Sequence, residues 1–170
     1  MNQSLGAVQE RITHLDQVMK VIQERLAECF DRLDVILTDQ QHFTTDLIAT
    51  VSAVSQDDPC RLAYLRRTTL IVKKAGRYYD AAIVRLQDQF LEMQTGAEAL
   101  QKQPAALHTR EVFTNHLQKI NQQIDMIRLT LEEVESRIHA SLASLVFAPN
   151  LQVTLEALGG MYGLETPIEG

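Results

Sequence analysis

The feature of this sequence best suited to binding chemistry is a run of basic residues in its second quarter. Between Pro59 and Asp80 there are six basic residues and no acidic one. At 100° per residue of helix, all of them except Arg61 fall within an arc of about 120°, which predicts one exposed stripe made of Arg66, Arg67, Lys73, Lys74 and Arg77. Such a stripe suits an acidic protein partner or a phosphate group.

The same residues have an internal explanation. If the following helix folds back along this one, residues 73–77 lie beside residues 132–136, which contain Glu132, Glu133 and Glu135. Ion pairs on a protein surface contribute only about 0 to 1 kcal/mol each. Both alternatives stay open, and internal pairing is the one that the sequence favours.

The C-terminal peptide is the second candidate binding element. Gly159 and Gly160 are adjacent and Pro167 follows them, a composition typical of a frayed and mobile terminus. The alternative is a short peptide that binds a partner protein through apolar anchors, which would be Met161, Tyr162 and Leu164.

The histidines and cysteines form no catalytic or metal-binding pattern. No Glu-x-x-His pair is present, although helical bundles commonly hold metals with that spacing. Cys29 falls on the apolar seam of its helix and is expected to fill the core. No Gly-rich phosphate loop occurs, and no nucleophile has a base and an orienting group within reach. We therefore expect a protein that is not an enzyme and that holds no metal or cofactor.

Composition narrows the class of partner. The chain has 170 residues, 45% of them hydrophobic, and a formal net charge of −6 from 22 acidic and 16 basic residues. An acidic surface disfavours nucleic acid, because neutralising phosphates requires a basic one. No apolar run reaches the roughly 20 residues that span a bilayer, and the first residues contain no signal-peptide stretch. These features predict a cytoplasmic protein without membrane contact.

Three long amphipathic helices must position these residues. No glycine or proline occurs from Ala7 through Asp58, and apolar residues recur there in alternating steps of three and four, which predicts one heptad helix. Equivalent series run from Leu62 to Leu100 and from Phe113 to Leu145. Pro104 and Pro149 mark the next breaks, so the predicted helices span about 4–55, 59–103 and 106–147.

Polar residues interrupt the apolar series near the first turn. Gln40 and Thr50 lie on the seam of the first helix, and Thr69 and Gly76 lie at similar heights on the second. Buried polar positions of this kind fix the register of packed helices. We predict a polar core layer at this end of the bundle.

The fold predicted is all-α: an elongated antiparallel three-helix bundle over residues 1–148 with heptad (coiled-coil-like) packing. Additional apolar residues beside the seam of the first helix favour two neighbours for it, although a helical hairpin that forms a homodimer is the architectural rival. Residues 149–170 are expected to form a short helix over Leu151–Leu158 and then a flexible, mobile tail.

A small acidic bundle with a terminal peptide resembles in architecture the export chaperones, including those for flagellar hook-associated proteins. The bundle, its terminal peptide and the missing catalytic features favour a non-catalytic protein-protein interaction module, such as a cytoplasmic secretion or assembly chaperone or an adaptor. The first alternative is a coiled-coil structural protein that self-assembles through its heptad faces. The second is a binder of nucleic acid or of an acidic partner through the basic residues from 61 to 77.

Overall fold

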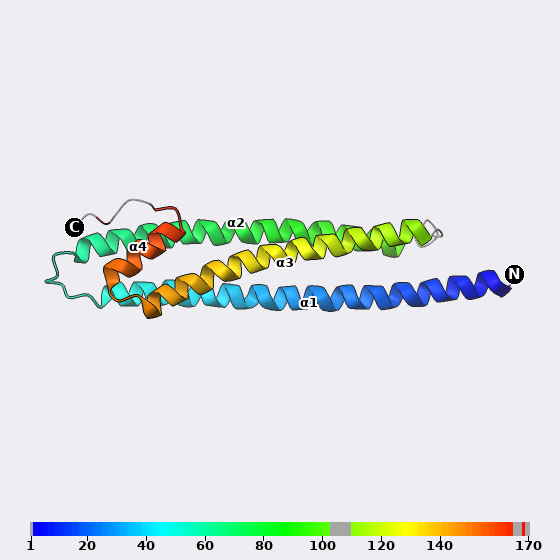
Figure 1. The fold of residues 1–170 in the computed structure, drawn as a ribbon, viewed down its shortest axis with the longest axis horizontal. Coiled ribbons are helices and arrows are strands. Elements are labelled where there is room, and N and C mark those ends of the chain that lie inside the picture. Colours follow the sequence, from blue (N-terminus) through cyan, green and yellow to red (C-terminus); the bar gives the residue numbers. More distant parts are fainter. Residues whose placement is uncertain (1, 103–109, 165–167, 169–170) are drawn as a thin grey trace. The chain divides into compact units, whose positions relative to one another are not determined.

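All of the regular structure in the computed structural model is helical. The model describes residues 2–102, 110–164 and 168, and within them it contains four helices and no strand. The helices are α1 (Asn2–Ser52), α2 (Arg61–Lys102), α3 (Arg110–Phe147) and α4 (Leu151–Met161) (Figure 1). The prediction of an all-α fold with three long helices that pack together is confirmed.

The helix bounds differ from the predicted ones by a few residues. α1 ends at Ser52 rather than near residue 55, and α2 begins at Arg61 rather than Pro59. Asp58 caps this start, because its Oδ1 accepts the backbone N–H of Cys60 at 2.8 Å. The predicted limits at 103 and 106 lie outside the described residues.

The chain divides into two compact units, each of which takes a segment from all three long helices. Unit 1 contains Met1–Arg32 and Arg85–Leu131, and unit 2 contains Leu33–Val84 and Glu132–Gly170. α4 therefore belongs to unit 2. Each unit is held together by its own core and its own polar contacts.

Unit 1 combines an apolar core with ion pairs at its surface. The rings of Phe30 and Phe90 stack with their centroids 4.4 Å apart. Arg25 of α1 donates from Nη1 to the Asn121 side-chain oxygen of α3 at 2.8 Å, and its Nη2 lies 3.6 Å from Asp125 Oδ1. The buried residues come from all three helix segments and include Met19, Ile22, Cys29, Leu86, Phe90, Met93, Ile120, Ile124 and Ile127.

Unit 2 buries a different set of seam residues from the predicted one. Thr50 and Thr69 are exposed, and the hydroxyl of each donates to the carbonyl four residues earlier. Val51 and Thr68 are buried instead, so the predicted polar layer is wrong at these two threonines. The physical reason is that each exposed threonine hydroxyl bonds to its own helix backbone one turn earlier and so needs no partner on a neighbouring helix.

The C-terminal segment is ordered further than predicted. α4 continues through Gly159 and Gly160 to Met161, and Tyr162 behind it is buried. Asn150 caps the helix as predicted, since its Oδ1 accepts the backbone N–H of Val153 at 2.9 Å. The predicted end at Leu158 and the release of the chain immediately after it are therefore corrected. Residues 165–167, 169 and 170 of the predicted tail lie outside the described residues.

Candidate interaction surfaces

The exposed face of α2 in unit 2 carries four of the five predicted basic site residues. We call Arg66, Lys73, Lys74 and Arg77 the basic stripe; all four are exposed. At 100° per residue they occupy an arc of about 100° on the helix. Arg67 does not belong to this surface, because only 6% of it is exposed, which corrects the prediction for that residue.

The internal pairing predicted for these residues is not found. In the described part of the chain, none of the four cations of the basic stripe takes part in an ion pair. The carboxylates at positions 132, 133 and 135 therefore do not neutralise them. The basic stripe faces solvent as a surface of positive charge within an acidic protein.

Apolar side chains interrupt the basic stripe. Leu70 lies between the basic residues on the same helix face and is 45% exposed, and Leu62 and Val84 are exposed along the same face. An exposed leucine among cations adds apolar contact area to an electrostatic surface. This combination suits a protein segment better than it suits a bare phosphate chain.

The buried Tyr162 forms the centre of a second site, which all helices of unit 2 help to build. Its hydroxyl lies 2.7 Å from the hydroxyl of Tyr79 on α2 and 2.8 Å from Ser141 Oγ on α3. Its ring lies 6.3 Å, centroid to centroid, from that of Phe43 on α1. Ser141 Oγ also donates to the Arg137 carbonyl at 2.9 Å.

One order of donors follows when the Ser141 proton is assigned to the Arg137 carbonyl, 2.9 Å away, rather than to Met161 Sδ at 3.7 Å. Each hydroxyl carries a single proton. Tyr162 then donates to Ser141, and Tyr79 donates to Tyr162. Three buried hydroxyls thus form one chain of hydrogen bonds that strengthen one another.

Burial perturbs the acidity of both tyrosines. Burial and the hydrogen bond with Tyr162 raise the pKa of Tyr79 far above its ordinary value. Burial also raises the pKa of Tyr162, and it outweighs the opposing effects of Ser141, Tyr79 and the Arg137 guanidinium. Both phenols are neutral donors at physiological pH, so this cluster is a binding and packing element.

Two arginines hold the backbone that follows α4. Arg137 of α3 donates from Nη1 to the carbonyl of Met161, and its guanidinium lies 4.9 Å from the ring centre of Tyr78. Arg67 of α2 donates from Nη2 to the carbonyl of Leu164 at 3.1 Å. Of the three predicted apolar anchors, Tyr162 is buried within the chain itself, whereas Met161 and Leu164 are half-buried and these arginines hold their backbone carbonyls.

Gly159 is required by the way in which Arg67 packs. A Cβ at position 159 would fall on Arg67 Nη2 and would lie only 2.9 Å from Cζ. A Cβ at the neighbouring Gly160 would meet nothing within 4 Å. The adjacent glycines, which the sequence alone presents as equivalent, therefore have different structural roles.

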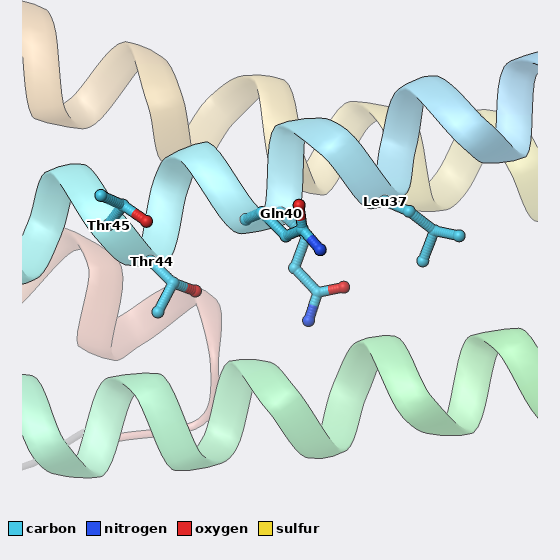
Figure 2. A pocket seen from close by; sticks show the side chains of 5 residues that line it. Leu37, Gln40, Thr44 and Thr45 are labelled. Carbon is cyan, nitrogen blue, oxygen red and sulfur yellow. The ribbon is translucent and has the colours of Figure 1, made fainter.

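An open surface hollow lies on α1 in unit 2. It is lined by Leu37, Gln40, Gln41, Thr44 and Thr45, and Figure 2 shows Leu37 and Thr44 extending from the same side of the helix. The lining offers amides and hydroxyls but no charged group. It is a shallow groove rather than an enclosed binding site.

No protein-family model, curated protein or solved structure matches this chain. A functional conclusion therefore has to come from its own residues. Within the described residues, no group of three or more His, Cys, Asp and Glu side chains is placed to hold a metal ion. In that same part of the chain, no helix has a stretch long and apolar enough to cross a membrane.

The heptad pattern does not bring the residues of the Tyr162 site together. Tyr79 lies in the apolar series from Leu62 to Leu100, and Ser141 is the polar position in the series from Phe113 to Leu145, whereas Arg137 belongs to neither series. A serine inside an otherwise apolar series and an arginine one turn before it are the available signals, because buried hydroxyls and guanidinium groups require partners. Local periodicity does not indicate that these partners come from the C-terminal peptide.

Proposed function

We propose that this protein is a non-catalytic, helical interaction module that binds an acidic protein segment through the basic stripe of α2. The observation that carries the proposal is the exposure, around Leu70 on one helix face, of four cations that form no ion pair with any residue the structure describes. Charge complementarity would guide the partner to this face, and Leu70 would contribute apolar contact. The role is that of an adaptor or an assembly chaperone.

The net charge of the protein supports a protein partner over nucleic acid. With a formal charge of −6, the protein as a whole repels a polyanion, whereas the basic stripe attracts one. An acidic helix or peptide is short enough to meet the basic stripe alone. Its own apolar residues would cover Leu70 and Val84.

We also infer that the long helices run in alternating directions with heptad-type contacts. In unit 1, Arg25 pairs with Asp125 and Glu28 pairs with Arg128, so α1 and α3 follow the same order along these pairs. α2, which connects them, then runs in the opposite direction. The cytoplasmic location and the absence of catalysis remain predictions from the sequence.

The test compares two variants with the same change in net charge. Lys73→Glu combined with Lys74→Glu reverses half of the basic stripe, whereas Lys20→Glu combined with Lys119→Glu reverses two exposed lysines of unit 1. Each variant is used to capture partners from native lysate at low and at high salt, with identification by mass spectrometry. We expect the first variant to lose acidic partners that the wild type and the second variant retain.

Quantitative binding then follows with the captured partner and with a DNA duplex. Two charge reversals should weaken the partner about tenfold at low salt, and added salt should reduce the difference. Equal capture by both variants contradicts the proposal. Tighter binding of the duplex than of any protein would replace it with a nucleic-acid function.

A further inference from the structure

The surface of unit 2 that holds α4 has the features of a peptide-binding site. We call it the α4 seat; its walls are Phe43 of α1, Arg67 and Tyr79 of α2, and Arg137 and Ser141 of α3. Three of these, Phe43, Tyr79 and Ser141, are almost completely inaccessible to solvent. The seat therefore combines an apolar floor, a pair of hydroxyls and two guanidinium groups.

The seat recognises a defined pattern in the segment that occupies it. Five positions of that segment are buried. Thr154 donates its hydroxyl to the Asn150 carbonyl within the segment itself, and the other four, Leu155, Leu158, Gly159 and Tyr162, read as Leu-x-x-Leu-Gly-x-x-Tyr. Both leucines are completely buried, the glycine leaves room for Arg67, and the phenol completes the hydroxyl chain. Gly159 and Tyr162 thus each meet a named residue of the seat.

α4 is a weak helix that depends on the seat for its order. It has 11 residues, fewer than the roughly 12 to 15 that an isolated helix needs in water. It also contains two glycines, each of which lowers the helical population about fivefold relative to alanine. Only residues 148–150 join it to α3. Opening of α4 as a local unit is therefore easier than unfolding of the long helices.

Arg67 is left incompletely satisfied by its present occupant. It is 6% exposed, donates to the neutral carbonyl of Leu164 at 3.1 Å, and has no partner for Nε within the described residues. No carboxylate in that part of the chain pairs with it. Arginine forms its strongest contacts with carboxylates, to which it donates two parallel hydrogen bonds. A ligand with a carboxylate at the position of Leu164 would satisfy Arg67 better than α4 does.

We propose that the α4 seat is a binding site for a helical peptide of the pattern Leu-x-x-Leu-Gly-x-x-Tyr that ends in a free carboxylate two residues after the tyrosine. α4 occupies the seat until such a peptide displaces it. The proposal does not depend on the basic stripe, because no residue of that stripe belongs to the seat. Failure of the proposed function would leave this site unaffected.

The test uses a synthetic peptide of residues 150–164 and the full-length chain. The peptide is prepared once with a free C-terminal carboxylate and once as the amide, and its binding is followed by fluorescence anisotropy. We expect the free acid to bind about tenfold more tightly than the amide, since only the acid offers Arg67 a charged, two-oxygen partner.

Two variants of the full-length chain, at adjacent glycines, change how tightly its own α4 competes with the peptide for the seat. Gly159→Ala disturbs the contact with Arg67 and loosens α4, so the peptide should bind this chain more tightly than the wild type. Gly160→Ala adds helix propensity where there is free space, so the peptide should bind that chain about fivefold more weakly. Equal affinity for the three chains would overturn the proposal.

Arginine variants show which residue reads the carboxylate. Arg67→Gln should remove the difference between acid and amide, whereas Arg66→Gln, on the adjacent exposed residue, should preserve it. Persistence of the difference in Arg67→Gln would refute the role of Arg67.

A measurement on the unmodified chain guards against variants that fail to fold. Amide hydrogen exchange should show α4 opening well before the buried segments of α2 and α3 in unit 2. Exchange of α4 only through global unfolding would overturn the proposal, because the seat would then never become free. Concentration-dependent dimers in which one copy's α4 fills the other's seat would overturn it, because a second copy continues past Leu164 and offers Arg67 no free carboxylate there.

Discussion

Removal of the Tyr162 hydroxyl should loosen α4 more than removal of the Tyr79 hydroxyl, although the two groups share one hydrogen bond. In Tyr162→Phe, Ser141 loses only a donor to its oxygen, but Tyr79 keeps a buried O–H without an acceptor. In Tyr79→Phe, Tyr162 still donates to Ser141 and loses only a bond that it accepts. The order of donors along the chain therefore predicts an asymmetric result.

The magnitudes follow from the cost of lost and unmade hydrogen bonds. A lost hydrogen bond costs about 1 kcal/mol, and a buried donor without a partner costs about 1 to 3 kcal/mol. We expect about 2 to 4 kcal/mol for Tyr162→Phe, which loses the bond to Ser141 and strands the Tyr79 donor, and about 1 kcal/mol for Tyr79→Phe. The double variant removes the stranded donor, so it should cost about 2 kcal/mol, less than the sum of the single changes.

Amide hydrogen exchange at Leu155 and Leu158 measures this cost, because both amides lie in α4 and report its opening free energy. Each 1.4 kcal/mol corresponds to about a tenfold faster exchange. Tyr64→Phe is the matched control. Tyr64 is half-buried on α2, and within the described residues its hydroxyl makes no contact with α4. The reasoning is refuted if Tyr79→Phe costs as much as Tyr162→Phe, or if the two costs add.

Two further predictions concern titration and thiol reactivity. Burial raises the pKa of Tyr79 and of Tyr162, so the docking of α4 is fully stable below about pH 10, the unfolded-state pKa of tyrosine. Above that pH, docking weakens by about 1.4 kcal/mol per pH unit for each buried phenol. Between pH 9 and 11, the opening free energy of α4 from hydrogen exchange should fall less steeply with pH in Tyr162→Phe than in the wild type, and equal slopes would contradict the assignment. Cys29 is buried and burial raises the pKa of its thiol, whereas Cys60 is half-buried, so Cys60 should be alkylated first and Cys29 only after unfolding, as followed by mass spectrometry; Cys29→Ser should leave the fast phase unchanged.

The local pattern of the chain was sufficient to predict its helices and much of its core. Every residue of the predicted apolar series from Ile120 to Ser141 on α3 is buried. A helix with a single apolar face can bury that face only by turning it toward its neighbours. The cap at Asn150 was also readable, since it depends on a hydrogen bond within three residues. The exposed positions of Arg66, Lys73, Lys74 and Arg77 followed from the same periodicity.

Contacts between residues far apart in the sequence decided which individual side chains are buried, and helix periodicity does not predict these contacts. Arg67 has the same local sequence character as Arg66, yet it is buried, because α4 and the residues after it return to this helix, where the Leu164 carbonyl, 97 residues further along the chain, accepts a hydrogen bond from Arg67. Similarly, Gly159 and Gly160 differ only through the position of the Arg67 guanidinium. A side chain's burial depends on which element covers its helix face, and this depends on the path of the whole chain. The sequence by itself therefore determined the helices and their basic face, whereas only the tertiary structure assembled Tyr79, Ser141 and Tyr162 into one site.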